Sequence, residues 1–195
     1  MGNARSSDTA FGMGDAIVRW KIEPLTRSRR GLDERLLLSA PWVVRILLRI
    51  LAGTAANSRI RRELITRIIR VGFAANTRGD HDTVCVFFDR AAEIHLAGGA
   101  ARIDLDPVYR GHEGIRKMLA EWKAGFEQFR FEPREVIDSG GDRFGVLVDY
   151  HGQISGTATH QLTGNVFMLR DGLAIRQDIY WDSEQVAEAL LTPAH

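Results

Sequence analysis

Two side-chain amides stand out in the segment THQLTGNVFMLRDGLAIRQDIYWD, residues 159–182. Asn165 and Gln177 occur there among large apolar residues whose pattern predicts two strands. A buried amide without a hydrogen-bond partner costs roughly 1–3 kcal/mol. The pair is therefore either a structural contact or a group that orients a bound molecule. Two amides carry more donors and acceptors than one mutual bond uses, and the surplus needs another partner.

The length of the loop between these strands decides whether the amides share a face. With a two-residue loop at 171–172, Asn165 would face Asp178. With a three-residue loop at 170–172, Asn165 faces Gln177. The longer loop separates apolar from charged residues more cleanly, so we expect it. The amide face then also carries Phe167, Leu169, Leu173, Ile175, Ile179 and Trp181.

A base for proton transfer could come from His95, because imidazole titrates near neutral pH. Glu93 lies on the same strand face by alternation and could orient it, but a histidine without a catalytic role at the rim of a sheet fits the pattern as well. Asp149 and His151 form a second acid–base pair, of a kind more typical of an exposed rim. The histidines lack the spacing of metal ligands and no phosphate-binding glycine loop is present, so we expect no metal and no cofactor.

Aromatic residues could form the walls of a pocket around the amides. Tyr109 precedes a long helix expected within residues 109–129 and could close over a ligand. Trp122 lies on the apolar stripe of that helix and is either core or pocket wall. The whole stripe consists of Ile115, Leu119, Trp122, Phe126 and Phe129.

The order of the expected elements indicates the fold class. Residues 58–76 predict a helix, residues 91–99 a short strand, and the part after residue 132 four strands and a closing helix. Helices followed by an antiparallel meander are typical of an α+β domain with helices on one face of the sheet. We expect this domain to cover residues 58–195.

The N-terminal part differs in charge from the rest. Residues 1–70 carry fourteen Arg or Lys against six Asp or Glu, although the net charge of the chain is only +1. Residues 1–31 predict no ordered element, and residues 32–57 predict a basic amphipathic helical extension. We expect its stripe of Val44, Leu47, Leu48 and Leu51 to dock on the domain or on a second subunit.

Composition disfavours several classes of partner. A basic helix could bind an anionic membrane through residues 36–51, but two arginines on its polar face are few for that role. No stretch predicts a membrane span, and the basic segment lacks the interleaved aromatics of a nucleic-acid site. The single cysteine, Cys85, cannot form an intrachain disulfide and favours a reducing, cytoplasmic setting.

Three segments together resemble the SnoaL-like branch of the nuclear transport factor 2-like, or cystatin-like, superfamily. They are NTRGDHDTVCVFFDRAAEIHL, YRGHEGIRKMLAEWKAGFEQFRFEPREVIDSGGDRFGVLV and FMLRDGLAIRQDIYWDSEQVAEAL, and the resemblance spans residues 58–191. It implies a cone, in which a curved antiparallel sheet wraps around helices and leaves an open cavity. The family includes polyketide cyclases. Its superfamily includes ketosteroid isomerases, limonene epoxide hydrolases, scytalone dehydratases and non-catalytic binding domains, so fold alone does not decide function.

Few functional residues carry over from the resemblance. Trp181 matches an aromatic residue of the isomerase steroid pocket. Asn165 matches the position of the protonated aspartic acid that donates to the oxyanion there, and an asparagine can still donate. At the position of the isomerase base the sequence has residues 94–96, without a carboxylate. Ile179 stands where an aspartate of the epoxide hydrolases would be. Both reactions are therefore disfavoured.

We expect the cavity to bind a small apolar molecule with a carbonyl or hydroxyl group. Turnover by cofactor-independent proton transfer, of the isomerase, cyclase or hydrolase type, would use His95 and Asn165 as catalytic groups and Gln177 as a polarising donor. The expected walls are Phe167, Ile179, Trp181, Tyr109 and Trp122. The alternatives are a non-catalytic carrier or sensor and a dimerisation module, and we expect a homodimer. An ionisable group within reach of the amides would favour catalysis.

Overall fold

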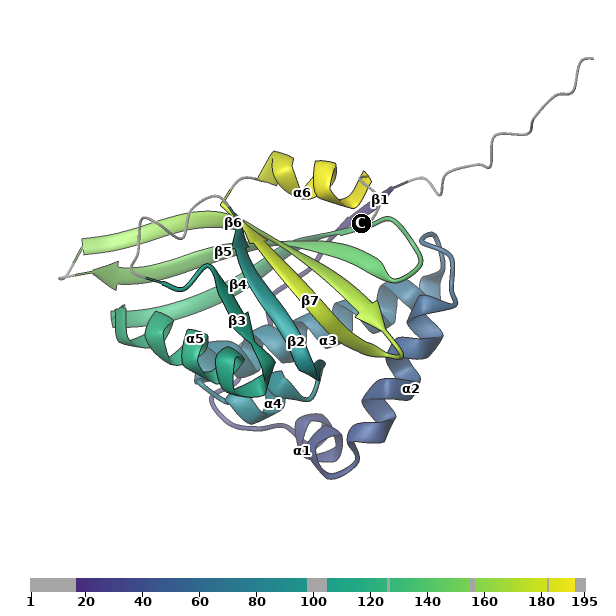
Figure 1. Cartoon of the computed structure of the whole chain (residues 1–195), viewed down its shortest axis with the longest axis horizontal. Coiled ribbons are helices and arrows are strands. Elements are labelled where there is room, and N and C mark those ends of the chain that lie inside the picture. The colour runs from purple at the N-terminus through teal and green to yellow at the C-terminus, as the bar shows by residue number, and fades with distance from the viewer. Residues whose placement is uncertain (1–16, 98–104, 126, 155–156, 182, 192–195) are drawn as a thin grey trace, which may run out of the picture.

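A curved seven-stranded sheet wraps around helices in this computed structural model, which describes residues 17–97, 105–125, 127–154, 157–181 and 183–191 (Figure 1). The strand order is β1-β4-β5-β6-β7-β2-β3, and all neighbours are antiparallel except β2 and β7. The predicted α+β class and cystatin-like fold are confirmed. The strands are β1 (Val18–Lys21), β2 (Phe88–Ala97), β3 (Val108–Arg110), β4 (Glu127–Asp138), β5 (Arg143–Ile154), β6 (Thr157–Arg170) and β7 (Leu173–Tyr180). The helices are α1 (Leu32–Ser39), α2 (Pro41–Ala52), α3 (Arg59–Arg78), α4 (His81–Cys85), α5 (Gly111–Gly125) and α6 (Ser183–Leu191).

The inner face of the sheet is covered by α3 and α5. The Ser58 side chain caps α3 by accepting from the Arg61 N–H, and Gly79 ends it in the left-handed conformation. The buried face of α3 includes Ile65, Ile69 and Phe73, which recur at helical spacing. This face and the apolar stripe of α5 belong to the main core.

The end of α5 differs from the prediction. The helix stops at Gly125 and β4 begins at Glu127, so Phe129 is a strand residue rather than part of the helical stripe. Phe126 lies outside the described residues. Apolar residues at 126 and 129 fit a helical period, but they also fit the start of a strand, and pairing with β5 decides between the two.

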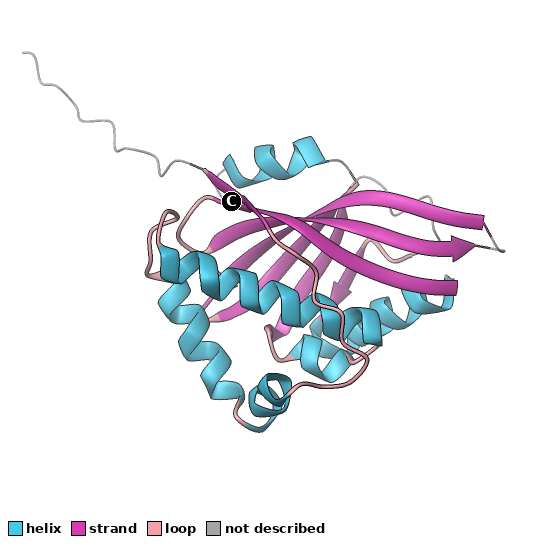
Figure 2. Cartoon of the chain, turned by 180° about the vertical axis from the view of Figure 1, so that it is seen from behind, coloured by secondary structure: helices cyan, strands magenta, loops and turns pink. Residues whose placement is uncertain are grey.

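The outer face of the sheet carries α6, seen above the sheet in Figures 1 and 2. Val186 and Leu190 of this helix pack on Leu147 and Val166 in a second, smaller core. Gly164 makes this approach feasible, because a Cβ there would lie 1.8 Å from Cγ2 of Val186.

The β6–β7 hairpin corrects the predicted register. Its loop is the two-residue turn Asp171-Gly172, with φ values of 52° and 76°, as is typical of a type I′ turn. The register then shifts by one residue between the pairs 169↔174 and 168↔176, leaving Ile175 as the extra residue of a bulge. The amides therefore return to one face, although Asn165 faces Ile179 and not Gln177. Ala174, expected on the opposite face, is part of the main core.

The N-terminal part contributes a strand that the sequence did not predict. β1 lies within residues 1–31, for which no element was expected, and pairs with the edge strand β4. α2 docks through Val44, Leu48 and Leu51, which belong to the main core. It runs so close to the β6–β7 turn that a Cβ on Gly172 would lie 2.2 Å from the Arg45 carbonyl oxygen. No helix in the described part is both long and apolar enough to span a membrane.

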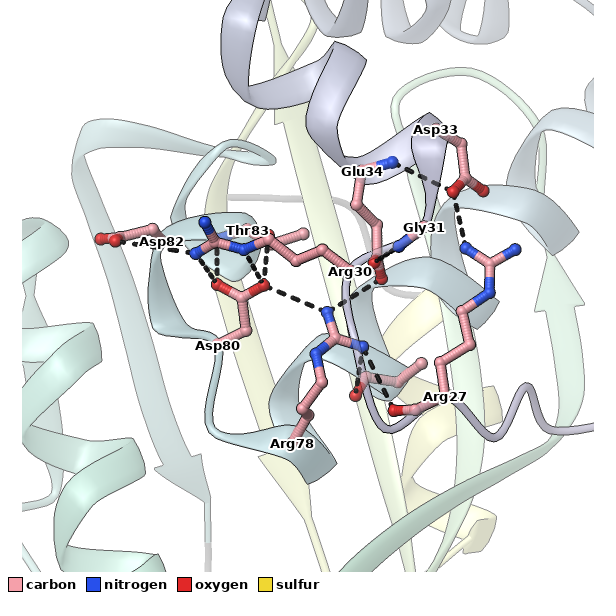
Figure 3. Close-up of polar contacts among 10 residues, drawn as sticks. Arg27, Arg30, Gly31, Asp33, Glu34, Arg78, Asp80, Asp82 and Thr83 are labelled. Carbon is pink, nitrogen blue, oxygen red and sulfur yellow. Dashed lines mark hydrogen bonds and ion pairs between the residues drawn. The ribbon is translucent and has the colours of Figure 1, made fainter.

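An ion-pair network ties α1 to the ends of α3 and α4 (Figure 3). Arg78 donates to the buried Glu34 at 3.0 Å and to Asp80 at 3.1 Å. Arg30 holds both oxygens of Asp80 at 2.5 and 2.6 Å. The hydrogen bonds from Arg30 lower the pKa of Asp80, which also caps α4 by accepting from the Thr83 N–H. Carboxylates and guanidinium groups thus alternate along the contact and attach the extension to the cone.

Arg61 connects three parts of the fold from a fully buried position. Its Nε and Nη2 donate to the two oxygens of Asp138 at 2.7 and 2.8 Å, and both side chains have no exposed surface. Its Nη1 donates to the carbonyl oxygens of Leu51, at the end of α2, and Gly141, in the β4–β5 turn. The Asp138 carboxylate also accepts from the Gly140 N–H at 3.0 Å. One guanidinium therefore joins α2, α3 and the β4–β5 hairpin.

Replacing Asp138 by alanine should destabilise the protein by about 3–5 kcal/mol, because the Arg61 charge is then buried without a carboxylate. Glu135→Ala is the matched control. It removes the exposed Arg19–Glu135 pair and should cost less than about 1 kcal/mol. Urea unfolding of both variants measures the difference. Similar decreases in the free energy of unfolding for the two variants would show that the buried pair does not hold the fold together.

Candidate functional site

The two amides meet on the inner face of the sheet, where both are buried. Gln177 Nε2 donates to Asn165 Oδ1 at 2.7 Å, so the expected mutual contact exists. The two residues are diagonal neighbours, because Asn165 pairs with Ile179 and Gln177 with Phe167. Within the described residues neither amide has a second hydrogen-bond partner. The Asn165 Nδ2 group and Gln177 Oε1 are thus left for a bound molecule or water.

Two small cavities adjoin the amide pair. The inner chamber, of about 40 Å³, lies between α5 and the sheet and is lined by both amides. The middle chamber, of about 70 Å³, lies between α3, α4 and the hairpin β6–β7 and is also lined by Gln177. The chambers share the walls Phe73, Asn76, Val84, Phe88 and Gln177. Gln177 therefore stands between two spaces rather than at the end of one.

Further polar groups on the chamber walls come from helices. Asn76 of α3 lines both chambers, although the sequence analysis treated NTRGD only as the end of the helix. The signal was present, since Asn76 follows Ile69 and Phe73 at helical spacing on the buried face. Trp122, expected as core or wall, lines the inner chamber, and its buried Nε1 has no hydrogen-bond acceptor among the described residues.

Neither chamber has an ionisable side chain among its described lining residues. The polar atoms there are amides, a threonine hydroxyl and an indole N–H, which are donors and acceptors of neutral hydrogen bonds. Thr163 already donates to the Val148 carbonyl oxygen at 3.3 Å. This arrangement can orient a carbonyl or hydroxyl group, but it provides no side chain that changes charge near neutral pH.

His95 lies outside the cavity, contrary to the expectation that it would act there as a base. In the parallel pairing of β2 with β7, Ile94 is the neighbour of Gln177 and His95 is the neighbour of Asp178. His95 therefore points to the outer face, where its Nε2 lies 2.8 Å from Glu93 Oε2. Hydrogen bonds from His95 and from Arg110 lower the pKa of Glu93. Glu93 and His95 do share one face of β2, as alternation predicts. That face is the outer one, and Ile94 lies on the inner face beside Gln177.

Tyr109 does not line the chambers either. Its hydroxyl donates to Glu121 Oε2 at 2.6 Å and accepts from the Asp106 N–H at 3.0 Å. The pKa of Tyr109 is raised, chiefly by burial of its hydroxyl and secondly by the hydrogen bond to Glu121. The hydroxyl therefore holds the loop before β3 to α5, and the expected closure over a ligand has no support.

The other expected wall residues divide between the chambers. Ile179 lines the inner chamber, and Phe167 lines the middle one. Trp181 lines neither, but its ring stacks on Trp122 at 6.3 Å between centroids. Rings of Phe129, Phe131 and Tyr150 surround Trp122 at 5.5 to 6.1 Å. Two members of this aromatic cluster, Trp122 and Phe131, line the inner chamber.

A third and larger cavity, of about 260 Å³, lies between α1, α2 and α3. We call it the extension cavity, because residues of the N-terminal extension form half of its wall. It shares Ile68 and Phe87 with the middle chamber. Its wall is apolar apart from Asp33 and Arg67 and otherwise includes Leu36, Leu37, Val43, Val44, Leu47, Leu64, Ile68, Val71 and Phe87.

One group of side chains of the metal-ligand type occurs in the described part of the chain, on the outer face. Ligand atoms of Asp149, His151 and His160 lie within 4.8 Å of one another. Cross-strand pairing places His151 opposite His160, which sequence spacing alone did not indicate. His160 and Arg134 both bind the Asp149 carboxylate on the face opposite the amides, whereas His151 Nε2 is buried without a hydrogen-bond partner among the described residues.

Solved structures similar to this chain share its fold. TerC co-crystallised with polyporic acid is 24% identical, with a TM-score of 0.54 over 65% of this chain and 97% of that one. An NTF2-like protein of unknown function from Burkholderia pseudomallei is 17% identical, with a TM-score of 0.54 over 65% and 96%. SalBIII, an epoxide hydrolase/cyclase-like enzyme, is 17% identical, with a TM-score of 0.51 over 63% and 94%. No curated protein matches the sequence.

A family model adds to this likeness of fold. The model described as SnoaL-like domain matches residues 69–177, more than half of the chain, within the region where the sequence resemblance was placed. The matched region contains the amide pair and most of the chamber walls. The chain therefore belongs to the SnoaL-like domain family.

Proposed function

We propose that this SnoaL-like protein binds a small, uncharged, largely apolar molecule and holds a carbonyl or hydroxyl group of it at the Asn165–Gln177 pair. The observation that carries this proposal is a buried amide pair with spare hydrogen-bonding capacity beside cavities that lack ionisable walls. Such capacity is costly to bury unless a ligand or water uses it.

Binding without turnover is the better supported form of this function. Proton transfer needs an ionisable group within hydrogen-bond reach of the reacting atom. His95, the expected base, lies on the outer face beside Glu93. The amides alone favour a carrier or sensor. The co-crystal of TerC with polyporic acid shows that a similar fold accommodates a small molecule.

The size of the cavities limits the shape of the ligand. A water molecule needs at least about 10–15 Å³ of such space, so the two chambers beside the amides hold only a few atoms. Small-molecule sites usually measure about 300–1,000 Å³. The extension cavity supplies most of the missing volume, and it shares the wall residues Ile68 and Phe87 with the middle chamber. An elongated ligand fits best, with its polar end at the amides and its apolar end towards α1 and α2.

Asn165→Leu should weaken the binding of an n-alkyl methyl ketone about tenfold, because it removes the donor to the carbonyl oxygen. The affinity for the alkane of equal chain length should stay unchanged or rise. Calorimetry with both probes distinguishes the two causes of weaker binding. Loss of the hydrogen bond weakens only the ketone, whereas loss of cavity space weakens the ketone and the alkane alike. Gln161→Leu is the control, since this exposed amide of the same strand lines no chamber. Equal ketone affinities of wild type and Asn165→Leu would remove Asn165 from the site.

The affinity for methyl ketones should rise with chain length until the extension cavity is filled. Leu47→Trp places a larger side chain on the wall of that cavity and should weaken long ketones about tenfold while leaving short ones unchanged. Leu191→Trp adds the same bulk at an exposed site on α6 as a control. If Leu47→Trp has no effect on long ketones, the ligand does not reach the extension cavity.

Ketone affinity should be constant between about pH 5 and about pH 9, the interval in which histidine and cysteine titrate. The reason is that no described wall residue of either chamber is ionisable. Repeating the calorimetry across this range, with circular dichroism to verify folding at each pH, tests the prediction. A step in affinity near neutral pH would indicate an ionisable group at the site and would reopen the catalytic alternative.

A further inference from the structure

The helix α2 is apolar on two faces. One face, with Val44, Leu48 and Leu51, is buried in the main core. The opposite face exposes Trp42 (64% exposed), Ile46 (47%) and Ile50 (45%), which follow one another at intervals of four residues. Residues at this spacing lie along one side of a helix. We call this exposed side, together with Arg45 and Arg49, the outer α2 face.

Exposed apolar side chains concentrate in this part of the molecule. Among the described residues, the large apolar side chains that are exposed lie between residues 32 and 60, with Leu191 as the exception. Leu32 and Leu36 on the neighbouring α1 belong to this set. Single exposed apolar residues are normal on protein surfaces, whereas a continuous row along a helix marks an interaction site.

The same segment is basic without interruption. Between Glu34 and Glu63 the sequence has no acidic residue and six arginines. Arg61 is buried against Asp138, and the other five, at positions 35, 45, 49, 59 and 62, are exposed. Arg45 and Arg49 directly precede Ile46 and Ile50 in the sequence and lie beside the exposed apolar row of α2. A partner of this face must therefore accept apolar side chains and carry negative charge.

We propose that the outer α2 face docks on an anionic lipid surface. Trp and Ile side chains can enter the boundary between headgroups and acyl chains, while the arginines contact phosphate groups beside them. A second copy of the chain is the weaker occupant, because a symmetric contact places the same basic face on both sides. The contact needs no rearrangement of the cone, since α2 stays anchored by its other face and by its close approach to Gly172 (Figure 1).

This proposal does not depend on the ligand of the cone. The family-matched region begins at residue 69, so the outer α2 face lies outside it. Contact of the outer α2 face with a membrane does not require a ligand in the chambers. The extension cavity is lined by Leu36, Val43 and Leu47 of the same two helices.

Sedimentation of the full chain with vesicles tests the proposal. The protein should bind vesicles of phosphatidylglycerol mixed with phosphatidylcholine, bind pure phosphatidylcholine much less, and dissociate as salt is raised. Replacing both Arg45 and Arg49 by Gln should lower binding about 30-fold, since each arginine contributes roughly a fivefold factor. Trp42→Ser should lower it about tenfold.

The control is Leu191→Ser, which removes an exposed apolar residue on α6 and should leave vesicle binding unchanged. Thermal unfolding of each variant verifies that the exposed substitutions leave the fold intact. The proposal is overturned if the wild type ignores anionic vesicles, or if the arginine and tryptophan variants bind as well as the wild type. It is also overturned if sedimentation equilibrium shows a dimer that Trp42→Ser dissociates, because the face then belongs to a second copy.

Discussion

The burial of the Arg61 guanidinium requires the fold to surround it with hydrogen-bond acceptors. The Asp138 carboxylate and the carbonyl groups of Leu51 and Gly141 meet this requirement. Because these acceptors come from the end of α2 and from the β4–β5 hairpin, one side chain of α3 ties the extension to the sheet, together with the core packing of α2 and the ion pairs of α1. The walls of the extension cavity and the exposure of the outer α2 face both follow from the position of the extension.

Polar groups on the chamber walls differ from those on the outer face of the sheet. The inner chamber holds amides, a threonine hydroxyl and an indole N–H, which are neutral and can be buried at moderate cost, and the buried Arg61–Asp138 pair lies outside it. The outer face holds ionisable side chains, such as Glu93 with His95 and Arg110, and Asp149 with Arg134 and His160. Desolvation of a charge costs far more than desolvation of an amide. The neutral walls of the two chambers are the basis of the proposal that the ligand is uncharged.

The N-terminal extension has two roles in the structure. One face of α2 completes the main core, while the ion pairs of Glu34, Arg78 and Asp80 hold α1 in place beside it. Its other face remains apolar and basic at the surface. The sequence predicts one apolar stripe on this helix, Val44, Leu47, Leu48 and Leu51, and favours its docking over contact with a membrane. Only the packed structure separates a buried stripe from an exposed one, because both consist of aliphatic and aromatic residues.

The sequence by itself determined the features that depend on local pattern. These are the α+β class, the SnoaL-like resemblance and the expectation that Asn165 and Gln177 share an apolar face, although the loop and register behind that expectation were wrong. The tertiary structure decided what depends on pairing between distant segments. The bulge at Ile175 set the register, the parallel contact with β7 turned His95 outwards, and the pairing of β5 with β6 placed His151 opposite His160. Side-chain periodicity reveals which residues share a face, but strand partners and the volume left between packed side chains are properties of the whole chain.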